Sequence, residues 1–269
     1  MVSARPMPAR MQRALRHAAY DLVGIKLGPD KETLLTSRVL KRMRELGLDD
    51  YDAYLRRFQG DPAEAEHFIN AITTNTTYFF REEDHFPILA RHCRQRVDRG
   101  QRRLRLWCAA SSTGQEPYTL AMAVLEGLEG RAVDLQILAT DIDTKVLNTA
   151  HRGIYPKEQL EKVPAMYRGY FQRSGESVQV VPQVRRLVRF ARLNLTKIPY
   201  PMKGPLDVIL CRNVMIYFDE PTRGKLVGEF ERLLGPGALL CIGHSESING
   251  LTRKVRVERP SVYRMPGEG

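Results

Sequence analysis

The stretch LRLWCAASSTGQEPYTLAMAVL, from Leu104 to Leu125, decides the fold of the larger part of the chain. An apolar run meets a turn of small residues, Ala109 to Gly114, and a helix-like stretch follows. A doubly wound sheet opens a nucleotide site with the same order of strand, tight turn and helix. This turn, however, has one glycine where a dinucleotide fingerprint has three, and it lacks the Gly-Lys-Ser/Thr of a triphosphate loop. It also brings a carboxylate, Glu116, to the place where phosphates would lie.

The pattern on the C-terminal side of this stretch alternates between strands and helices, which favours a doubly wound, mostly parallel α/β sheet. Strands are expected at 104–109, 135–140, 187–193, 206–211 and 237–243, and helices at 116–128, 143–151 and 220–234. The alternation breaks at about residues 155–187. There the segment YRGYFQRSGESVQVVPQV predicts a small inserted antiparallel β subdomain.

The N-terminal part, residues 11 to about 90, has helical patterns instead. Between Asp30 and Leu46 the apolar residues fall on one helical stripe, and Gly47 ends that helix. Another helix begins near Asp61, with proline at its first position, and ends before Thr73. We therefore expect a helical domain at 1–90 and an α/β domain at 91–269.

The bulk composition agrees with a globular protein of two domains. The chain has 269 residues, of which 43% are hydrophobic, so it can bury a substantial core. It has neither the roughly 18 apolar residues of a membrane span nor the apolar core of a signal peptide. These features predict a cytoplasmic protein. The widely spaced cysteines suggest buried small hydrophobes in a reducing compartment; they are Cys93, Cys108, Cys211 and Cys241.

The net charge is +11, and two concentrations of basic residues stand out. The predicted helix at 30–46 carries the first cluster, and residues 177–206 carry basic side chains with no acid between them. Two interpretations of the first cluster stay open: a solvated helix face, or an electrostatic dock for an acidic protein or nucleic acid. Its members are Arg38, Lys41, Arg42 and Arg44.

Polar residues follow successive predicted strands, at the edge where doubly wound sheets bind ligands. In chain order they are Glu116, Asp141, Asn194 with Leu195, Arg212 with Asn213, and Tyr217. A carboxylate at Asp141 suits the hydroxyls of a ribose, and backbone groups at Asn194 and Leu195 suit a base edge. S-adenosylmethionine fits this set because it combines a base, a ribose and cationic groups without phosphates. Simpler roles remain open: Asp141 as a helix cap and Glu116 as an ordinary first-turn acid.

Six segments together resemble the chemotaxis-receptor glutamate methyltransferases, the CheR family. They are NAITTNTTYFFREEDHFPIL (Asn70 to Leu89), WCAASSTGQEPYTLAM, LATDIDTKVLNTAHRGIY, LNL, ILCRNVMIYFD and GHSES. The resemblance covers roughly residues 15 to 263. It implies a class I methyltransferase fold with an all-α N-terminal domain and an inserted three-stranded β subdomain. The implied reaction transfers a methyl group from S-adenosylmethionine to glutamates of a chemoreceptor-type signalling protein in sensory adaptation.

The resemblance also assigns residues. It implies cofactor contacts at Asn75, Thr77, Arg81, Glu116, Asp141, Asn194, Leu195, Arg212 and Asn213. Arg81 and Tyr217 match residues near the transferable methyl group, and the basic cluster at residues 38–44 would dock the receptor's acidic cytoplasmic helices. Without the resemblance, Thr76 to Phe80 is better interpreted as a loop that packs aromatic rings on the core.

The implied chemistry needs few catalytic groups. A glutamate side chain has an unperturbed pKa of roughly 4.3, so it is already an anionic nucleophile at pH 7. No general base or metal is required, and no His/Cys/Asp cluster has metal-ligand spacing. His85, His92 and Cys93 are interpreted as helix-surface or packing residues. Either Arg81 or Arg212 could hold the incoming carboxylate through a charged fork.

Three other functions fit parts of the sequence. A nucleic-acid methyltransferase would suit the positive charge, but the Asp/Asn-Pro-Pro-aromatic turn of amino methyltransferases is replaced by Arg212 to Met215. A docking module without turnover is disfavoured because all the matched polar residues are intact. A hydrolase is disfavoured because GHSES at Gly243 lacks the second glycine of a nucleophile elbow.

The β insertion bears on partner binding. Some family members hold a pentapeptide from the receptor's C-terminus there as an added strand, and they tend to have a longer, glycine-richer loop. Here QRSGESVQV, from Gln172 to Val180, is short and has Gly175 alone. We therefore expect no pentapeptide binding. We also expect no nucleic-acid partner and no membrane insertion, although receptor arrays could recruit the enzyme to the membrane.

Overall fold

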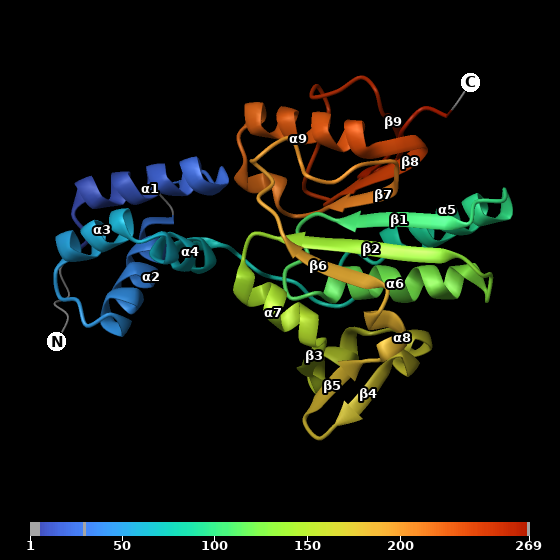
Figure 1. Cartoon of the computed structure of the whole chain (residues 1–269), viewed down its shortest axis with the longest axis horizontal. Coiled ribbons are helices and arrows are strands. Elements are labelled where there is room, and N and C mark those ends of the chain that lie inside the picture. The colour runs from blue at the N-terminus through green and yellow to red at the C-terminus, as the bar shows by residue number, and fades with distance from the viewer. Residues whose placement is uncertain (1–5, 29–30, 268–269) are drawn as a thin grey trace. The chain divides into compact units, whose positions relative to one another are not determined.

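The computed structural model describes residues 6–28 and 31–267 (Figure 1). Contacts divide the chain into two compact units. The helical unit is the chain up to Thr74 together with Tyr217–Thr222, and the α/β unit is Asn75–Ile216 together with the chain from Arg223 onward. This division comes earlier than the predicted boundary at residue 90, because Phe79 and Phe80 are buried in the α/β core.

The helical unit has four helices in the described residues: α1 (Ala9–Val23), α2 (Glu32–Glu45), α3 (Tyr51–Gly60) and α4 (Pro62–Ile72). The stripe predicted for α2 is confirmed, since Leu35, Val39 and Met43 are buried. Asp50 and Asp61 cap α3 and α4, because each carboxylate accepts a backbone N–H of the first turn.

The α/β unit is built on a sheet whose described strands run in the order β6-β2-β1-β7-β8-β10-β9. The strands from β6 to β8 pair in parallel, and β10 and β9 add an antiparallel edge. The bounds are β1 (Arg103–Cys108), β2 (Asp134–Asp141), β6 (Val188–Arg192), β7 (Leu206–Cys211), β8 (Leu234–Ile242), β9 (Arg256–Arg259) and β10 (Val262–Arg264). The mostly parallel, doubly wound sheet is therefore confirmed.

Helices α5 (His85–Asp98) and α6 (Gln115–Leu128) lie together against one face of the sheet (Figure 1). They pack closely, because a Cβ placed on Gly127 would lie 2.8 Å from the Cβ of Ala90. The remaining helices of this unit are α7 (Thr144–Arg152), α8 (Pro182–Arg185) and α9 (Glu220–Leu233), of which α9 begins within the short segment assigned to the helical unit.

On the β1 strand, Trp107 is fully buried. Its ring packs edge-to-face on Tyr200 and Phe230, with centroids 5.4 and 5.5 Å away. Its indole N–H donates to Oγ1 of Thr140, one residue before the end of β2, at 2.9 Å. Trp107 thus links two central strands to the loop that follows β6.

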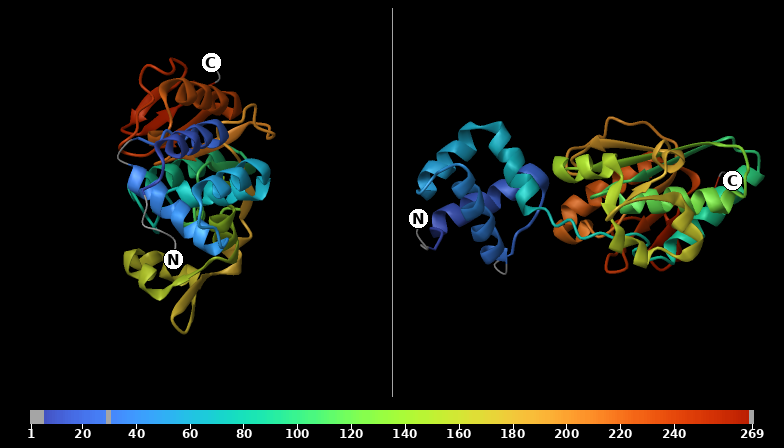
Figure 2. Two further views of the ribbon diagram at one scale, coloured as in Figure 1. Left: turned by 90° about the vertical axis from the view of Figure 1, so that its left-hand side faces the viewer. Right: turned by 90° about the horizontal axis from the view of Figure 1, so that it is seen from below.

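The insertion is a three-stranded antiparallel sheet in the order β3-β5-β4, which confirms the predicted subdomain. Its strands are β3 (Ile154–Pro156), β4 (Phe171–Ser174) and β5 (Ser177–Val180), and the 3₁₀ helices η2 (Lys157–Lys162) and η3 (Ala165–Tyr170) come between β3 and β4. The β4–β5 hairpin projects from the rest of the α/β unit (Figure 2). Its turn is Gly175-Glu176, and Gly175 has a φ of 57°.

The expected strands and helices of the alternating region all form, with bounds within three residues of those predicted. Two features were missed. The short β9–β10 hairpin carries too few residues for a clear alternating pattern. Helix α5 runs from His85 to Asp98, so it continues across the domain boundary that was expected at residue 90.

The cysteines are all buried and free in the described chain, as their apolar surroundings predict. Burial raises the pKa of the Cys93 and Cys241 thiols to about 12. None of the helices in the described ranges has the length and apolar character needed to cross a membrane.

Candidate cofactor-binding site

The turn between β1 and α6 is fixed to the end of β2. The backbone N–H groups of Ser111 and Ser112 donate to the carbonyl of Thr140 and to Oδ2 of Asp141, each at 2.8 Å. Gly114 has a φ of 96°, and a Cβ there would lie 2.8 Å from the Cβ of Ala150. Only glycine is tolerated at such a position without strain, so the single glycine of the turn has a structural cause.

Asp141, the last residue of β2, is 9% exposed. Its two oxygens accept the N–H groups of Ser112, at 2.8 Å, and of Asp143, at 3.0 Å. Burial raises the pKa of the Asp141 carboxyl, although these backbone donors oppose the shift. The side chain that caps α7 is Asp143, which accepts the N–H groups of Lys145 and Val146. The interpretation of Asp141 as the cap of the next helix is therefore wrong.

Glu116, in the first turn of α6, is half-buried beside Arg212, which follows β7. Arg212 donates from Nη1 to Oε2 of Glu116 at 3.1 Å. Oε1 of Glu116 is buried and has no hydrogen-bond partner within the described residues. Burial raises the pKa of Glu116, and the Arg212 guanidinium opposes this. The site therefore presents a carboxylate oxygen that needs a donor, which an ammonium group would provide.

The guanidinium of Arg212 is held on several sides, and its side chain is 1% exposed. Besides Glu116, it donates to the carbonyl of Arg81 and, from Nη2 at 3.0 Å, to Oε2 of Glu82. Burial lowers the pKa of Arg212, but the two carboxylates outweigh burial and the net shift is upward. The structure therefore leaves Arg212 as a structural cation, without a free fork for an incoming carboxylate.

Sequence reasoning missed Glu82. Its Oε1 accepts Nδ2 of Asn213 at 3.0 Å, while its Oε2 accepts from Arg212 and from the backbone of His244. Burial acts to raise the pKa of Glu82, but Asn213 and Arg212 lower it on balance. Glu82 follows Arg81 in a quoted motif, but nothing in its spacing marks it as a partner of residues 130 positions away.

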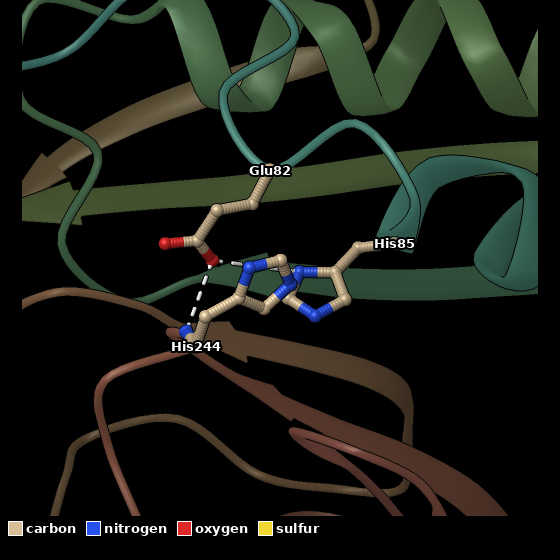
Figure 3. Close-up of side chains that lie close together, drawn as sticks. All are labelled: Glu82, His85 and His244. Atoms are coloured by element: carbon tan, nitrogen blue, oxygen red, sulfur yellow. Dashed lines mark hydrogen bonds and ion pairs between the residues drawn. The ribbon is translucent and has the colours of Figure 1, made fainter.

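Two histidines lie beside Glu82 (Figure 3). The rings of His85 and His244 are 4.8 Å apart, and Nδ1 of His85 lies 3.8 Å from Oε2 of Glu82. Burial and Arg212 lower the pKa of His85 to about 4, so its ring is neutral at pH 7. The three side chains could supply metal ligands, since their ligand atoms lie within 4.8 Å of one another. Arg212, however, already supplies a cation to the same oxygen of Glu82.

The segment that opens the α/β unit contributes Asn75, Thr77 and Arg81. Asn75 donates from Nδ2 to Asp143 at 2.8 Å, and its carbonyl accepts the Ser112 hydroxyl. Thr77 is half-buried. Arg81 is also half-buried, and its Nη1 donates to the carbonyl of Thr76 at 2.6 Å.

The aromatic residues of this segment pack as expected. Phe79 makes edge-to-face contacts with Tyr155 and Phe171, in both cases with centroids 5.0 Å apart. The backbone N–H of Phe80 donates to Oγ1 of Thr119 in α6 at 3.2 Å. The aromatic rings therefore fix the loop whose polar residues reach the strand ends.

After β6, the chain passes the end of β2 again. The N–H of Leu193 donates to the Asp141 carbonyl at 3.0 Å, which brings Asn194 and Leu195 next to that strand end. Oδ1 of Asn194 accepts from Thr196, and the Leu195 carbonyl accepts the Tyr200 hydroxyl at 2.7 Å. The loop is thus held by its own side chains.

Tyr217 ends the 3₁₀ helix η4 (Met215–Tyr217) and belongs to the helical unit by its contacts. Its carbonyl accepts the N–H of Lys26 at 3.1 Å. Apart from the half-buried Thr77, the contacts above gather the predicted cofactor-binding residues at the strand ends of the α/β unit, and the role of Tyr217 stays a prediction.

The basic cluster on α2 is not uniform. Arg38, Lys41 and Arg44 are exposed. Arg42 instead donates from Nε and Nη2 to the buried carboxylate of Glu64, at 2.9 and 2.8 Å. These hydrogen bonds raise the pKa of Arg42. Its charge neutralises a buried acid, so it is not free to meet a partner.

Two family domains match the chain in succession. The all-alpha domain of CheR methyltransferases matches residues 12–73, and the SAM-binding domain of CheR methyltransferases matches residues 75–263. Together they span most of the chain. Their junction coincides with the contact boundary at Thr74.

Curated relatives agree with these matches. Chemotaxis protein methyltransferase 2 of Pseudomonas aeruginosa is 42% identical over 255 residues, covering 93% of this chain and 90% of that protein. The chemotaxis protein methyltransferase of Klebsiella aerogenes is 40% identical over 275 residues, covering 100% and 93%. That of Escherichia coli is 40% identical over 258 residues, covering 93% and 89%. With both domains matched in order and the relatives aligned over most of their length, the chain belongs to the CheR methyltransferase family.

Proposed function

We propose that this chain transfers the methyl group of S-adenosylmethionine to glutamate side chains in the cytoplasmic domain of a methyl-accepting chemoreceptor. The carboxylate oxygen forms a bond to the methyl carbon as the bond from that carbon to sulfur breaks, so the products are a glutamate methyl ester and S-adenosylhomocysteine. The observation that carries the proposal is the buried Oε1 of Glu116, an acceptor without a partner in the described chain. Leaving such a group unsatisfied costs roughly 1–3 kcal/mol, which a bound ammonium group would offset. The names of the relatives supply the acceptor class, and the enzyme would act in the cytoplasm at receptor arrays.

The residues at the strand ends suit the cofactor. Glu116 would accept its ammonium group, and Asp141 would accept hydrogen bonds from the ribose hydroxyls. Asn194 and Leu195 would lie on the base side. Asn75 and Thr77 would border the site from the segment that opens the α/β unit. When bound, S-adenosylmethionine supplies an electrophilic methyl group on a sulfonium.

The protein's contribution to the reaction is then positioning and exclusion of water. A receptor glutamate is ionised at pH 7, so no side chain has to remove a proton. Holding two reactants in the right geometry contributes about 7–11 kcal/mol to a rate enhancement. Arg81 is the better candidate for holding the incoming carboxylate, because Arg212 is enclosed by Glu82 and Glu116. Tyr217 would shape the surroundings of the methyl group.

Incubation with radiolabelled S-adenosylmethionine and a purified receptor cytoplasmic domain tests the function. We expect label on the receptor that is released as methanol by mild base. A receptor whose candidate glutamates are replaced by alanine is the matched control and should stay unlabelled. Base-stable label would contradict ester formation, and transfer to nucleic acid in place of the receptor would favour the alternative methyltransferase.

Charge reversal on α2 should weaken receptor docking. We expect Arg38→Glu with Lys41→Glu to lower receptor methylation and to blunt its dependence on salt, because exposed charges mainly steer association. Cofactor affinity should not change. Methylation rates across a range of ionic strengths, together with calorimetry for the cofactor, measure both effects.

The control for this prediction carries the same charge change elsewhere. Arg99 and Arg102 are exposed in the α/β unit. Reversing both should leave receptor methylation near that of the wild type. If the α2 double variant methylates as well as this control at every ionic strength, α2 is only a solvated face.

The inserted sheet should not bind a receptor C-terminal pentapeptide. Strand addition needs a free sheet edge and a loop that lets a peptide backbone approach. The turn between β4 and β5 is confined to Gly175-Glu176 and offers no such loop. We expect no heat of binding in calorimetry with a receptor pentapeptide, whereas micromolar binding would show that the edge of β4 suffices.

A further inference from the structure

Glu246 lies in the segment that follows β8 and receives an unusual number of backbone donors. Its Oε1 accepts the N–H groups of Val214, at 2.9 Å, and Met215, at 2.8 Å. Its Oε2 accepts those of Asn213, at 2.8 Å, and Gly243, at 2.6 Å. Consecutive N–H groups that converge in this way form a concave site for an anion. A carboxylate of the protein itself occupies that site.

The loop that Glu246 holds is the one that carries Arg212 and Asn213 after β7. Asn213 has a φ of 57°, a left-handed conformation that costs energy for a residue with a side chain. The N–H groups of residues 213–215 need partners because they do not enter the β7 ladder. Glu246 supplies those partners and so stabilises the strained conformation.

The contact between the two loops is tight. A Cβ on Gly243 would lie 2.6 Å from Nδ2 of Asn213 and 2.8 Å from Oε2 of Glu246. The backbone of His244, in the same segment, also donates to Oε2 of Glu82 at 3.2 Å. Glu82 therefore holds the side chains of Arg212 and Asn213, and Glu246 holds the backbone that presents them.

We infer that Glu246 is a positioning residue for the cofactor site. It fixes the backbone after β7, so that Arg212 meets Glu116 and the unpartnered Oε1 of Glu116 stays aimed at the ligand. This inference rests on the proposed function, since it takes the strand ends as the cofactor site. Glu246 has to be a carboxylate because both of its oxygens accept backbone N–H groups. A glutamine side chain would place its NH2 group, which is a donor, against some of these backbone donors.

Glu246→Gln is the test, with affinity for S-adenosylhomocysteine measured by calorimetry and KM for S-adenosylmethionine measured separately from kcat. We expect both the dissociation constant and KM to rise about tenfold or more, because charge-assisted hydrogen bonds are lost. The change in kcat should be smaller than the change in KM. A purely structural role would lower the folded fraction, and with it kcat, while leaving KM as it is.

The matched control is Glu258→Gln. Glu258 also accepts charged hydrogen bonds, from Nε and Nη2 of Arg264 at 2.8 and 3.0 Å, but it lies on the edge strand β9. Its replacement should leave cofactor affinity unchanged. If Glu246→Gln does not fold, Gly243→Ala disturbs the same loop contact and should raise the same dissociation constant.

The binding measurements distinguish a failure of the positioning role of Glu246 from a failure of the proposed function. A folded Glu246→Gln or Gly243→Ala protein whose affinity is within about twofold of wild type would overturn the positioning role. A wild-type protein that does not bind S-adenosylhomocysteine would overturn the proposed function itself, together with this inference.

Discussion

Arg212→Met is expected to lower the free energy of unfolding of the α/β unit by about 3–5 kcal/mol, because it leaves buried carboxylates without their cation. Glu116 and Glu82 have side chains that are only 14% exposed, and Arg212 contacts both of them. Removing one partner of a buried ion pair is costly even where the intact pair adds little. Denaturant titration measures the loss, and calorimetry should detect no cofactor binding.

Two further substitutions test whether the loss of stability comes from the buried position and the planar shape of the Arg212 guanidinium. Arg212→Lys keeps the charge but cannot span two carboxylates with a planar fork, so we expect an intermediate loss. Arg232→Met is the surface control. Arg232 pairs with Glu229 one turn away on α9, and its removal should change stability far less. Stability of Arg212→Met close to that of Arg232→Met would contradict a buried network centred on Arg212.

Asp141→Ala is expected to weaken cofactor binding by about 1.5–3 kcal/mol, the value of hydrogen bonds to a charged group. The carboxylate ends β2 and already orders the neighbouring turn through Ser112 and Asp143. Asp141→Asn keeps the shape of the side chain and should lose less. Calorimetry with S-adenosylhomocysteine measures both dissociation constants.

The control for Asp141 is at the other end of the same strand. Asp134 begins β2 and pairs with Arg105 at the surface. Asp134→Ala should bind the cofactor as wild type does. Equal affinity of Asp141→Ala and Asp134→Ala would mean that Asp141 only fixes the turn.

The sheet and its helices were predictable because hydrophobic periodicity is strong where elements are long and buried. Asp141 and Glu116 could be found for a similar reason. Polar residues directly after apolar strands must gather at one edge of a parallel sheet. Which aspartate would cap α7 was not predictable, since Asp141 and Asp143 both precede the helix and only the backbone path distinguishes them.

Other parts of the site depend on distant pairings that leave no local pattern. Glu82 and Glu246 are polar loop residues, and their partners become apparent only when β7 and β8 lie side by side. The position of Arg42 indicated its burial only in part, because Arg42 borders the apolar stripe of α2. Its partner Glu64 lies on another helix, so a docking role and a buried ion pair looked alike in sequence.

Trp107 gives the molecule a built-in optical probe, because it is the one tryptophan of the chain. Its ring, on β1, packs against Tyr200 and Phe230, and the Tyr200 hydroxyl donates a hydrogen bond to the carbonyl of Leu195. Indole emission therefore comes from a single buried environment in the α/β unit, next to the loop that we propose to lie on the base side of the cofactor. A spectral shift to the red would indicate that water has entered this half of the protein, whatever the state of the helical unit.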